Sequence, residues 1–579
     1  MSIKSTSTRG KDPRVVGPTG SYVRELIPPN VGTGPHRKNV QAVTLVVWIT
    51  TASLSTALFY QPWLGIGSNY RAAALGLIFP GAGYLASANT LGYILFVLTL
   101  AAIPPALFAV SSEKWFGAGA IIFPILVWGL SILGAYAVTS DTVWESAGVY
   151  AFGGLVAVFA YANRSASAER IRGLKTREAR NVIIPQQLAR MDEAAARESK
   201  SEEDEELDLE ALRKLQFLFD QAFQDLDDWS GFTVIDQFQT SALRYQIYQM
   251  MYILGLYQAV YAPNVHGYVS EAFRRVIERS LTKKVLEFWK WERLAGKFSL
   301  DWDPVQYDNI MVTGFLLHGV MLYTANTGDY RYTQPGSLNF HVTDNRCYKY
   351  SVHDLQESLV RQWSSSPYFL IPCEPNWIYV MCNLQGMTGA VLYDRVFGTK
   401  ATQMLLPSFE ESLNTNFTET SGSVLTIRSE LTGFAIPGIA GVAGDLAVVM
   451  MGSGPLRNLS RRLWAVVREE NVVFDEETKE LSMTGLVGAD NIDTGNYTSS
   501  ANAVFSQVAI GAAEYGEETL KSAAIEKLEK EWGLLTTSTG SKSFDLTKCS
   551  TLMNYAVLTA TLLRPGAYNR MVQKVRTSG

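Results

Sequence analysis

The sequence predicts an all-α protein in two parts: N-terminal transmembrane helices, followed by an (α/α)6 toroid, which is a closed ring of six helix pairs. Three observations predict this. Charged residues make up only 18% of the 579 residues and hydrophobic residues 47%, whereas an average soluble protein has about 25% charged residues. Charge-free stretches long enough to cross a bilayer gather in the first third of the chain. From about Leu212 onward, apolar and aromatic stretches with helical spacing recur between short breaks.

The predicted membrane part begins after a polar tail, residues 1–39. A bilayer span needs roughly 20 apolar residues, and four charge-free stretches meet this length: 40–60, 90–111, 116–139 and 146–163. Residues 72–88 are shorter and are interrupted by Pro80, Gly81 and Gly83, so this segment either spans or forms a re-entrant piece among the others. We therefore expect a transmembrane region over 40–163 with about four spans.

The flanks of this region predict its orientation. Basic residues such as Arg14 and Arg37 precede the first span, and Arg164, Arg170 and Arg172 follow the last. Because positive residues stay on the cytoplasmic side, both flanks should be cytosolic, which needs an even number of crossings. We expect an integral protein of the endoplasmic reticulum or another internal membrane, with its large domain in the cytosol. Five crossings remain the alternative, and glycosylation sequons at Asn163, Asn416, Asn458 and Asn496 would favour that luminal placement.

The rest of the chain is predicted to be a charged linker, 164–211, and the toroid, 212–579. Residues 192–210 are dense in acidic side chains and contain no Gly or Pro, which is typical of a solvated, partly helical tether. Six apolar stretches then predict inner helices that start near Ala242, Asn309, Cys382, Pro437, Ser500 and Ser550. Several end at a glycine, a helix C-terminal signal, and lead into a more polar helix. Repeated helix pairs suit a closed ring around a central cavity; an open solenoid is the structural alternative.

Charge and cysteine content exclude some classes of protein. A net charge of -5 argues against a nucleic-acid partner, which requires a basic face. Four cysteines and five histidines show no zinc-binding spacing, and the glycine-containing runs match no phosphate-binding loop. These residue patterns therefore argue against a metal site.

The most unusual segment is Ile371-Pro-Cys-Glu-Pro-Asn-Trp, which leads into the third inner helix. Cys373 and Cys382 bracket this loop, and Glu374 and Asn376 add a carboxylate and an amide. A cysteine at a helix start feels the positive end of the helix dipole, which lowers the thiol pKa. The alternatives are a local disulfide or two buried structural cysteines.

Two further segments carry candidate residues. Asn309 and Met311 open the second inner helix, and His318 lies one turn beyond Phe315 on the same face. On the first inner helix, Tyr245 and Tyr248 share a face. Core packing is the alternative for both groups, because apolar faces commonly bury single histidines and aromatic stripes.

These residues resemble the linalool dehydratase-isomerase family. The similarity is clearest in Asn309-Ile-Met…Gly314 and in Cys373-Glu-Pro…Cys382-Asn, and it follows chain order from about 212 to 567. The resemblance implies an α/α toroid enzyme that needs no metal or organic cofactor. Such an enzyme removes water from a tertiary monoterpene alcohol and isomerises it to a primary allylic alcohol.

The resemblance also implies site residues. Its catalytic side chains correspond to Cys373, Cys382, Tyr245 and Asp220. The family's histidine falls at Phe315, so we expect His318, one turn away, to serve in its place. The predicted substrate-binding residues are Glu374, Asn376, Phe315, Met311, Asn309 and Tyr248.

We therefore expect a membrane-anchored lyase or isomerase of terpenoid secondary metabolism, acting on a lipophilic isoprenoid alcohol beside the bilayer. Self-association is left open. One alternative is protonation-initiated cyclisation of a longer terpenoid. Another is carbohydrate chemistry, which would need two carboxylates across the cavity, drawn from Asp301, Asp303, Glu374 and Asp490. A third is a non-catalytic membrane scaffold.

Overall fold

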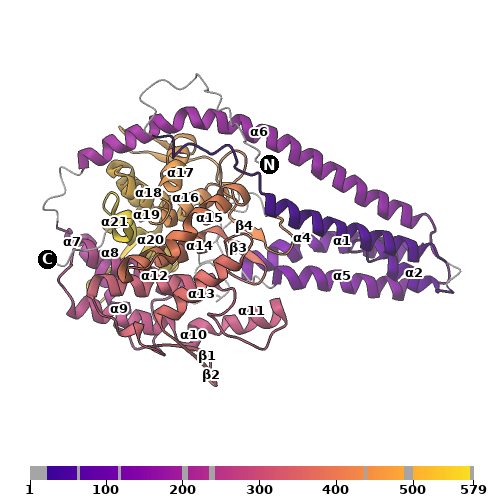
Figure 1. Ribbon diagram of the computed structural model, residues 1–579, viewed down its shortest axis with the longest axis horizontal. Helices are drawn as coiled ribbons and strands as arrows, with labels where there is room; N and C mark the ends of the chain where they lie inside the picture. The colour runs from indigo at the N-terminus through magenta and orange to yellow at the C-terminus, as the bar shows by residue number, and fades with distance from the viewer. Residues whose placement is uncertain are drawn as a thin grey trace, which may run out of the picture.

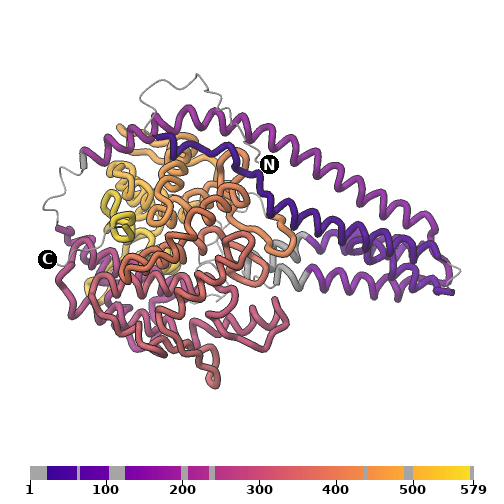
Figure 2. The backbone as a smooth tube through the Cα atoms, viewed as in Figure 1, coloured from indigo at the N-terminus to yellow at the C-terminus, as the bar shows by residue number. Residues whose placement is uncertain are grey.

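The computed structural model describes residues 22–61, 65–114, 119–198, 206–233, 242–435, 440–487 and 500–573. The chain is mostly helical, as predicted. A slender bundle of N-terminal helices projects from a larger rounded helical domain, and one long helix, α6, runs along both (Figures 1 and 2).

The slender bundle contains α1 (Pro35–Phe59), α4 (Thr90–Lys114), α5 (Gly119–Val138) and the first part of α6 (Ala147–Glu198). The segment predicted to be ambiguous, 72–88, contains two short helices, α2 (Ser68–Leu75) and α3 (Ala82–Ala86). Both are largely buried in the core of the bundle, in contact with α1, α4 and α5. The outward face of the bundle is apolar: Val43, Val46, Leu54, Val97 and Leu130 are all more than half exposed.

Within the part of the chain that the structure describes, two helices are long and apolar enough to cross a membrane, α1 and α12 (Ile310–Thr327). Helix α12 is 83% buried within the rounded domain, whereas the apolar window of α1 is only 17% buried. The described parts of α4 and α5 contain shorter apolar stretches, Thr90–Ile103 and Pro124–Val138. By length and composition, α1 is thus a candidate span and α12 is a core helix.

Helix α6 corrects the predicted linker. Instead of ending near residue 163, the helix continues without a break to Glu198, through Pro185. Its second half packs on the rounded domain because Ile184, Leu188 and Met191 are buried in that domain's core. The acidic run that we expected to be a solvated tether thus begins, up to Glu198, as part of a packed helix.

The rounded domain is a closed ring of six inner helices. Each inner helix contacts the next, and the last contacts the first, so the alternative of an open solenoid is wrong. The inner helices are α8 (Leu243–Val260), α12 (Ile310–Thr327), α14 (Val380–Phe397), α16 (Gly441–Gly452), α18 (Asn502–Tyr515) and α20 (Thr551–Leu562). Each begins within a few residues of its predicted start.

An outer layer of amphipathic helices surrounds the ring. It contains α7 (Leu209–Ala222), α9 (Gly267–Ser280), α13 (Val352–Ser365), α15 (Ala401–Asn416), α17 (Arg457–Glu470) and α19 (Glu518–Trp532). Outer and inner helices alternate along the chain. Consequently every loop that leads into an inner helix lies at the same end of the ring.

The loops that flank the inner and outer helices contain short helices and strands. The helices are α10 (Lys283–Leu286), α11 (Phe288–Lys297), α21 (Ala567–Gln573) and the 3-10 helix η4 (Arg331–Thr333). Four antiparallel strand pairs are β1 (Leu338–Thr343) with β2 (Arg346–Tyr350), β3 (Trp377–Tyr379) with β4 (Ile427–Ser429), β5 (Val472–Phe474) with β6 (Leu481–Met483), and β7 (Leu534–Thr536) with β8 (Lys542–Phe544). The β3–β4 pair joins the loop before α14 to the loop before α16.

Glycines allow α12 and α14 to pack very closely. A Cβ on Gly314 would lie 2.7 Å from Gly386 Cα, and a Cβ on Gly389 would lie 2.6 Å from the His318 backbone nitrogen. Real Cβ atoms do not approach so closely, so larger residues would force these helices apart. The close approach brings the cavity-facing side chains of α12 beside those of α14.

Candidate functional site

The ring encloses a cavity of about 280 Å³. All six inner helices contribute side chains to its wall, and most of that wall is apolar or aromatic. Cys373, Glu374 and Tyr379 line it from the segment before α14, and Tyr568 lines it from α21. Enclosed apolar cavities with a few convergent polar groups are the usual form of small-molecule sites.

A tight turn presents Cys373 and Glu374 to the cavity. The Trp377 backbone N–H donates to the Glu374 carbonyl at 3.0 Å, and the Cys373 N–H donates to the Trp377 carbonyl at 2.8 Å. Pro375 and Asn376 occupy the two central positions of this turn, and Asn376 has φ 75°. Proline followed by an asparagine with positive φ is typical of a type II turn, so the local sequence explains the turn.

Asn383 fastens this segment to α14. Its Oδ1 accepts from Trp363 Nε1 at 3.0 Å and from the Ile371 N–H at 2.9 Å. Its Nδ2 donates to the carbonyls of Ile371 and Tyr379, both at 2.9 Å. The side chain is fully buried, and with four hydrogen bonds it fixes the loop that carries Cys373 against the helix that carries Cys382.

The two predicted cysteines both line the cavity, as free thiols. Their sulfur atoms are 3.2 Å apart, and Cys373 Sγ donates to Cys382 Sγ. Burial and the neighbouring Cys382 raise the pKa of the Cys373 thiol well above its usual value. The lowering expected of a cysteine at a helix start does not occur at Cys373, because this residue lies seven positions before Val380, the first residue of α14, and is buried. This thiol stays protonated and acts as a hydrogen-bond donor.

Glu374 is the titratable group best suited to proton transfer near neutral pH. It is buried, and neither carboxylate oxygen has a hydrogen-bond partner among the described residues. Burial raises its pKa to about 7, against the opposing charge of Arg244. A carboxyl with a pKa near the working pH can both give and take a proton.

His318 lines the cavity from α12, as predicted, but it is neutral. Burial lowers its pKa to about 3, and its ring stacks on Tyr252 with centroids 4.5 Å apart. Gln385 Nε2 lies 2.6 Å from His318 Nδ1. With the amide donating, the ring proton sits on Nε2, and Nε2 has no hydrogen-bond partner among the described residues. This N–H is thus a buried donor whose hydrogen bond is not satisfied by the described residues.

The aromatic residues that were predicted to bind substrate form part of the wall. Phe315, Tyr245 and Tyr248 line the cavity, with the Phe315 ring 5.9 Å from Tyr245 and 5.5 Å from Tyr248 between centroids. Met311 is not part of the wall itself. It lies directly behind, where its Sδ accepts from the Tyr245 hydroxyl at 3.5 Å.

Two predictions are not supported by the geometry. Asp220 lies on the outer helix α7, where its carboxylate accepts from Gln216 and Thr539, and it does not line the cavity. Asn376 holds the neighbouring loop instead of facing the cavity: its Oδ1 accepts from Ser429 Oγ at 2.8 Å and from the Leu431 N–H at 3.0 Å.

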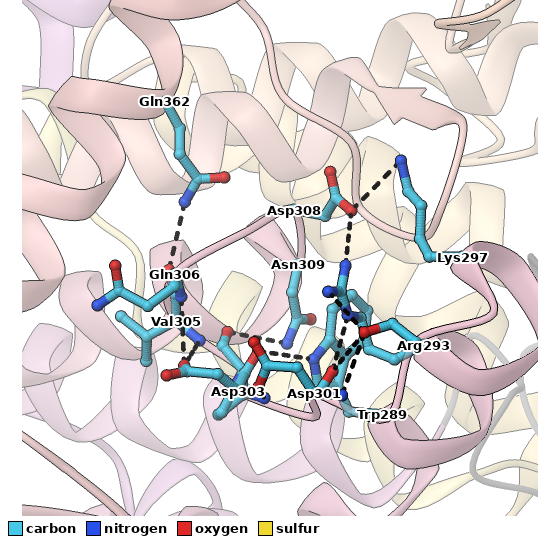
Figure 3. A network of polar contacts seen from close by, with 12 residues as sticks. Trp289, Arg293, Lys297, Asp301, Asp303, Val305, Gln306, Asp308, Asn309 and Gln362 are labelled. Carbon is cyan, nitrogen blue, oxygen red and sulfur yellow. Dashed lines mark hydrogen bonds and ion pairs between the residues drawn. The ribbon is translucent and has the colours of Figure 1, made fainter.

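Asn309 is likewise a structural residue. It adopts φ 59° before α12, a conformation that asparagine tolerates better than most residues, and its Nδ2 donates to the Pro304 carbonyl at 3.1 Å. Figure 3 shows it within a polar network, and Asn309 does not line the cavity. There Asp303 Oδ1 accepts from the Val305 N–H, and Arg293 and Lys297 flank Asp308 at 3.6 and 3.7 Å.

The sequence analysis did not predict several residues of the cavity wall. Gln385, Tyr252, Tyr379, Gln507 and Tyr568 all line the cavity. Gln385 lies one turn after Cys382, and Tyr252 one turn after Tyr248, so helical spacing from the predicted residues could have identified these two. Tyr568 lies beyond the last inner helix, and no local pattern signals its position.

The cavity wall contains few groups for acid catalysis or metal binding. Among the described residues, Glu374 is the single carboxylate in its wall, so the carboxylate pair that carbohydrate cleavage would need is not formed there. Asp301 and Asp303 belong to the outer network of Figure 3, and Asp490 is outside the described residues. A search of the described residues for clusters of three or more His, Cys, Asp or Glu that could hold a metal found none.

The ring of paired helices and its enclosed, acid-bearing cavity define an (α/α)6 protein with an enzyme-like site. Residues 244–545 match the model of the linalool dehydratase/isomerase family. Because the match covers more than half of the 579 residues, the chain belongs to the linalool dehydratase/isomerase family. The family implies an enzyme of the lyase or isomerase type.

Other comparisons are more distant. Among solved structures, the chain is similar to a novel alpha-amylase from Clostridium perfringens, with 16% identity, a TM-score of 0.37, and coverage of 61% of this chain and 97% of that one. It is also similar to an unsaturated glucuronyl hydrolase from Streptococcus agalactiae, with 9% identity, a TM-score of 0.34, and coverage of 62% and 93%. TM-scores this low support no conclusion about the reaction. No curated protein matches the chain.

Proposed function

We propose that the protein is a membrane-anchored enzyme that dehydrates or isomerises an isoprenoid alcohol by acid–base chemistry, without a metal ion. The observation that carries this proposal is the junction before α14. It places two thiols and a carboxyl with a pKa of about 7 in the wall of a cavity that is otherwise apolar and aromatic.

The chemistry requires an acid at the departing oxygen and a base at the neighbouring carbon. In our proposal the protonated Glu374 gives its proton to the substrate hydroxyl, and the C–O bond breaks. Water departs, and an allylic cation remains. The Glu374 carboxylate then takes a proton from the adjacent carbon, the C–H electrons form the new double bond, and the acid is restored. In isomerisation, water instead adds to the other end of the allylic cation and forms a new C–O bond there, and the Glu374 carboxylate takes the proton that this water loses, which restores the acid.

In our proposal the remaining wall residues orient the substrate and stabilise the allylic cation. Cys373 and Cys382 flank the substrate, and one of the two thiols holds the hydroxyl group by a hydrogen bond. His318 Nε2 offers a further donor to this oxygen. The ring faces of Tyr245, Tyr248 and Phe315 stabilise positive charge on carbon by cation–π attraction, and the apolar wall excludes bulk water.

Cysteine variants test this assignment. Cys373→Ala and Cys382→Ala should each reduce turnover of an isoprenoid alcohol by isolated membranes. Cys549→Ala is the matched control, because Cys549 is also a buried free cysteine but does not line the cavity. Glu374→Gln should reduce turnover by about 10²–10⁴-fold, the usual contribution of general acid–base catalysis. Undiminished turnover in the two cavity cysteine variants would refute the assignment.

Cyclisation of a longer terpenoid is the second candidate. Two points favour it: the resemblance places Phe315 where the family has a histidine, and the cavity wall includes residues from Ala440, just before α16, to Gly454, just after it. At 1.5 Å per residue this stretch is about 20 Å long, longer than a ten-carbon substrate requires. Product analysis with C10, C15 and C20 substrates separates the two candidates, since a ring-containing product indicates cyclisation. An inactive scaffold is less favoured because the cavity is not filled by side chains and both cysteines line it.

Membrane anchoring is supported by the surface of the slender bundle. Exposed Val, Leu and Ile side chains on α1, α4 and α5 would be stable in lipid but costly in water. In our proposal four crossings keep both flanks in the cytosol, at the endoplasmic reticulum or another internal membrane. Asn416, one of the glycosylation sequons, is buried and accepts from the Arg37 N–H. A glycosidase-induced shift in mobility of the full-length protein would overturn the cytosolic placement.

A further inference from the structure

The cavity has a defined direction relative to the apolar bundle. Helices α6 and α17 run antiparallel, because Arg180 pairs with Glu470 at the end of α17, whereas Asp192, further along α6, pairs with Arg461 near its start. The apolar part of α6 precedes both pairs. The outer helix α17 therefore ends toward the bundle, and the loops that lead from outer to inner helices lie at the bundle-facing end of the ring.

A second set of contacts supports this direction. The loop between α15 and α16 supplies Thr426 and Ile427 to the cavity wall. The same loop touches the base of the bundle, where Gln41 of α1 donates to the Gly433 carbonyl at 3.0 Å. In Figure 1, β3 and β4 lie on the side of the ring that faces α1 and α4. The end of the cavity that carries Cys373 and Glu374 thus faces the apolar helices.

This end of the ring carries exposed apolar side chains, which we call the mouth collar: Trp291, Phe298, Leu300, Leu431 and Phe434. Their exposed fractions are 46%, 83%, 68%, 66% and 52%. Two contacts place the collar at the base of the bundle, since α11, which contains Trp291, contacts α5, and the Leu431–Phe434 loop contacts Gln41 through Gly433.

The composition of the collar suits one partner. Aromatic side chains with nearby lysines are typical of the membrane–water interface, and Lys290 Nζ lies 4.7 Å from the centre of the Trp291 ring. Cations at such a surface are attracted to anionic lipid headgroups. The collar also lies directly where α1 passes from the ring into its apolar stretch, so the surface and the candidate span are continuous.

We propose that the mouth collar rests in the headgroup region of the bilayer that holds α1, α4 and α5, so that the cavity receives its lipophilic substrate directly from the membrane. This inference rests on the membrane anchoring proposed above. It adds an orientation: the end of the cavity that carries Cys373 and Glu374 faces the lipid surface.

Lipid-quenching measurements on the full-length protein test the inference. The exposed Cys347 is replaced by serine, and single cysteines are introduced by Phe298→Cys in the collar, Val46→Cys on α1 and Met404→Cys at the start of α15. Met404 is a matched control, because it is 74% exposed but lies at the opposite end of the ring. Each variant carries an environment-sensitive fluorophore and is reconstituted in phosphatidylcholine nanodiscs containing nitroxide-labelled phosphatidylcholine.

We expect nitroxide lipids to reduce emission from the labels at 298 and 46 and to leave the label at 404 unchanged. Quenching at 46 with none at 298 would overturn the collar inference and leave the anchoring intact. An unquenched label at 46 would overturn the anchoring itself, and the inference with it. Equal quenching at 298 and 404 would also overturn the inference, because it would show that the two ends of the ring are equally close to lipid.

Discussion

Asn383 offers a direct test of how the catalytic loop is held. Asn383→Ala removes four hydrogen bonds and leaves the Ile371 N–H and C=O, the Tyr379 carbonyl and Trp363 Nε1 without their partner. At a net value of about 1 kcal/mol for each bond, the free energy of unfolding should fall by about 4 kcal/mol. Because the loop carries Cys373, that thiol should also become accessible.

Two measurements check this prediction. Urea unfolding in detergent gives the change in the free energy of unfolding, and the rate of reaction with a thiol reagent reports the exposure of Cys373. Asn471→Ala is the control, since among the described residues the Asn471 side chain makes one hydrogen bond, to the Thr484 carbonyl, in an exposed position, and its loss should cost less than about 1 kcal/mol. A loss below about 1 kcal/mol in Asn383→Ala, with unchanged thiol reactivity, would refute the proposed role of this residue.

Three further predictions follow from the packing and the charges. Gly389→Ala places a methyl group 2.6 Å from the His318 nitrogen and should destabilise the fold by about 1–3 kcal/mol, as measured by thermal unfolding. Glu374 and Glu514 are buried, and burial raises their pKa values to about 7, so the folded state holds their protons more tightly than the unfolded state. The free energy of unfolding should therefore fall as pH rises from about 4.5 past 7, by about 3 kcal/mol for each group. Glu514→Gln should make this fall smaller, as measured by urea unfolding at several pH values. Asp220→Asn should leave turnover by isolated membranes within about twofold of wild type, because Asp220 bonds to surface groups outside the cavity; a large loss would restore it as a catalytic candidate.

Sequence reasoning succeeded where a pattern repeats. Six apolar stretches with helical spacing predicted six inner helices, and the unusual Cys-Glu-Pro segment predicted a group of residues that the ring brings into one cavity. It failed where the outcome depends on three-dimensional contacts. The sequence does not show that Cys373 is buried, and burial raises the pKa of its thiol. It also predicts that Asn309 and Asn376 bind substrate, whereas their backbones adopt positive φ and their side-chain amides hold loops in place.

The same distinction explains the error at α6. The acidic residues predict a solvated, partly helical tether, and α6 is helical up to Glu198. The sequence does not reveal that Ile184, Leu188 and Met191, which recur on one face of α6, are covered by the ring. Only the ring, as a packing partner, decides whether this helix is a free tether or part of the core. Asp220 was misplaced for a related reason: its assignment depended on spacing to a family motif, and spacing does not reveal whether a residue belongs to an outer or an inner helix.

Helix α6 has a practical consequence for anyone who wishes to work with the ring in isolation. At 1.5 Å per residue its 52 residues form a rod about 78 Å long, and its distal half contributes to the same hydrophobic core as the inner helices. Truncation immediately after Glu198 would remove α6, expose the apolar core that it covers, and give a fragment that aggregates. A water-soluble fragment should instead begin within α6, near residue 164. It should also include residues Tyr22–Val31, because Ile27 and Val31 belong to the same core. This segment can be added as a separate peptide or joined to the fragment by a designed linker.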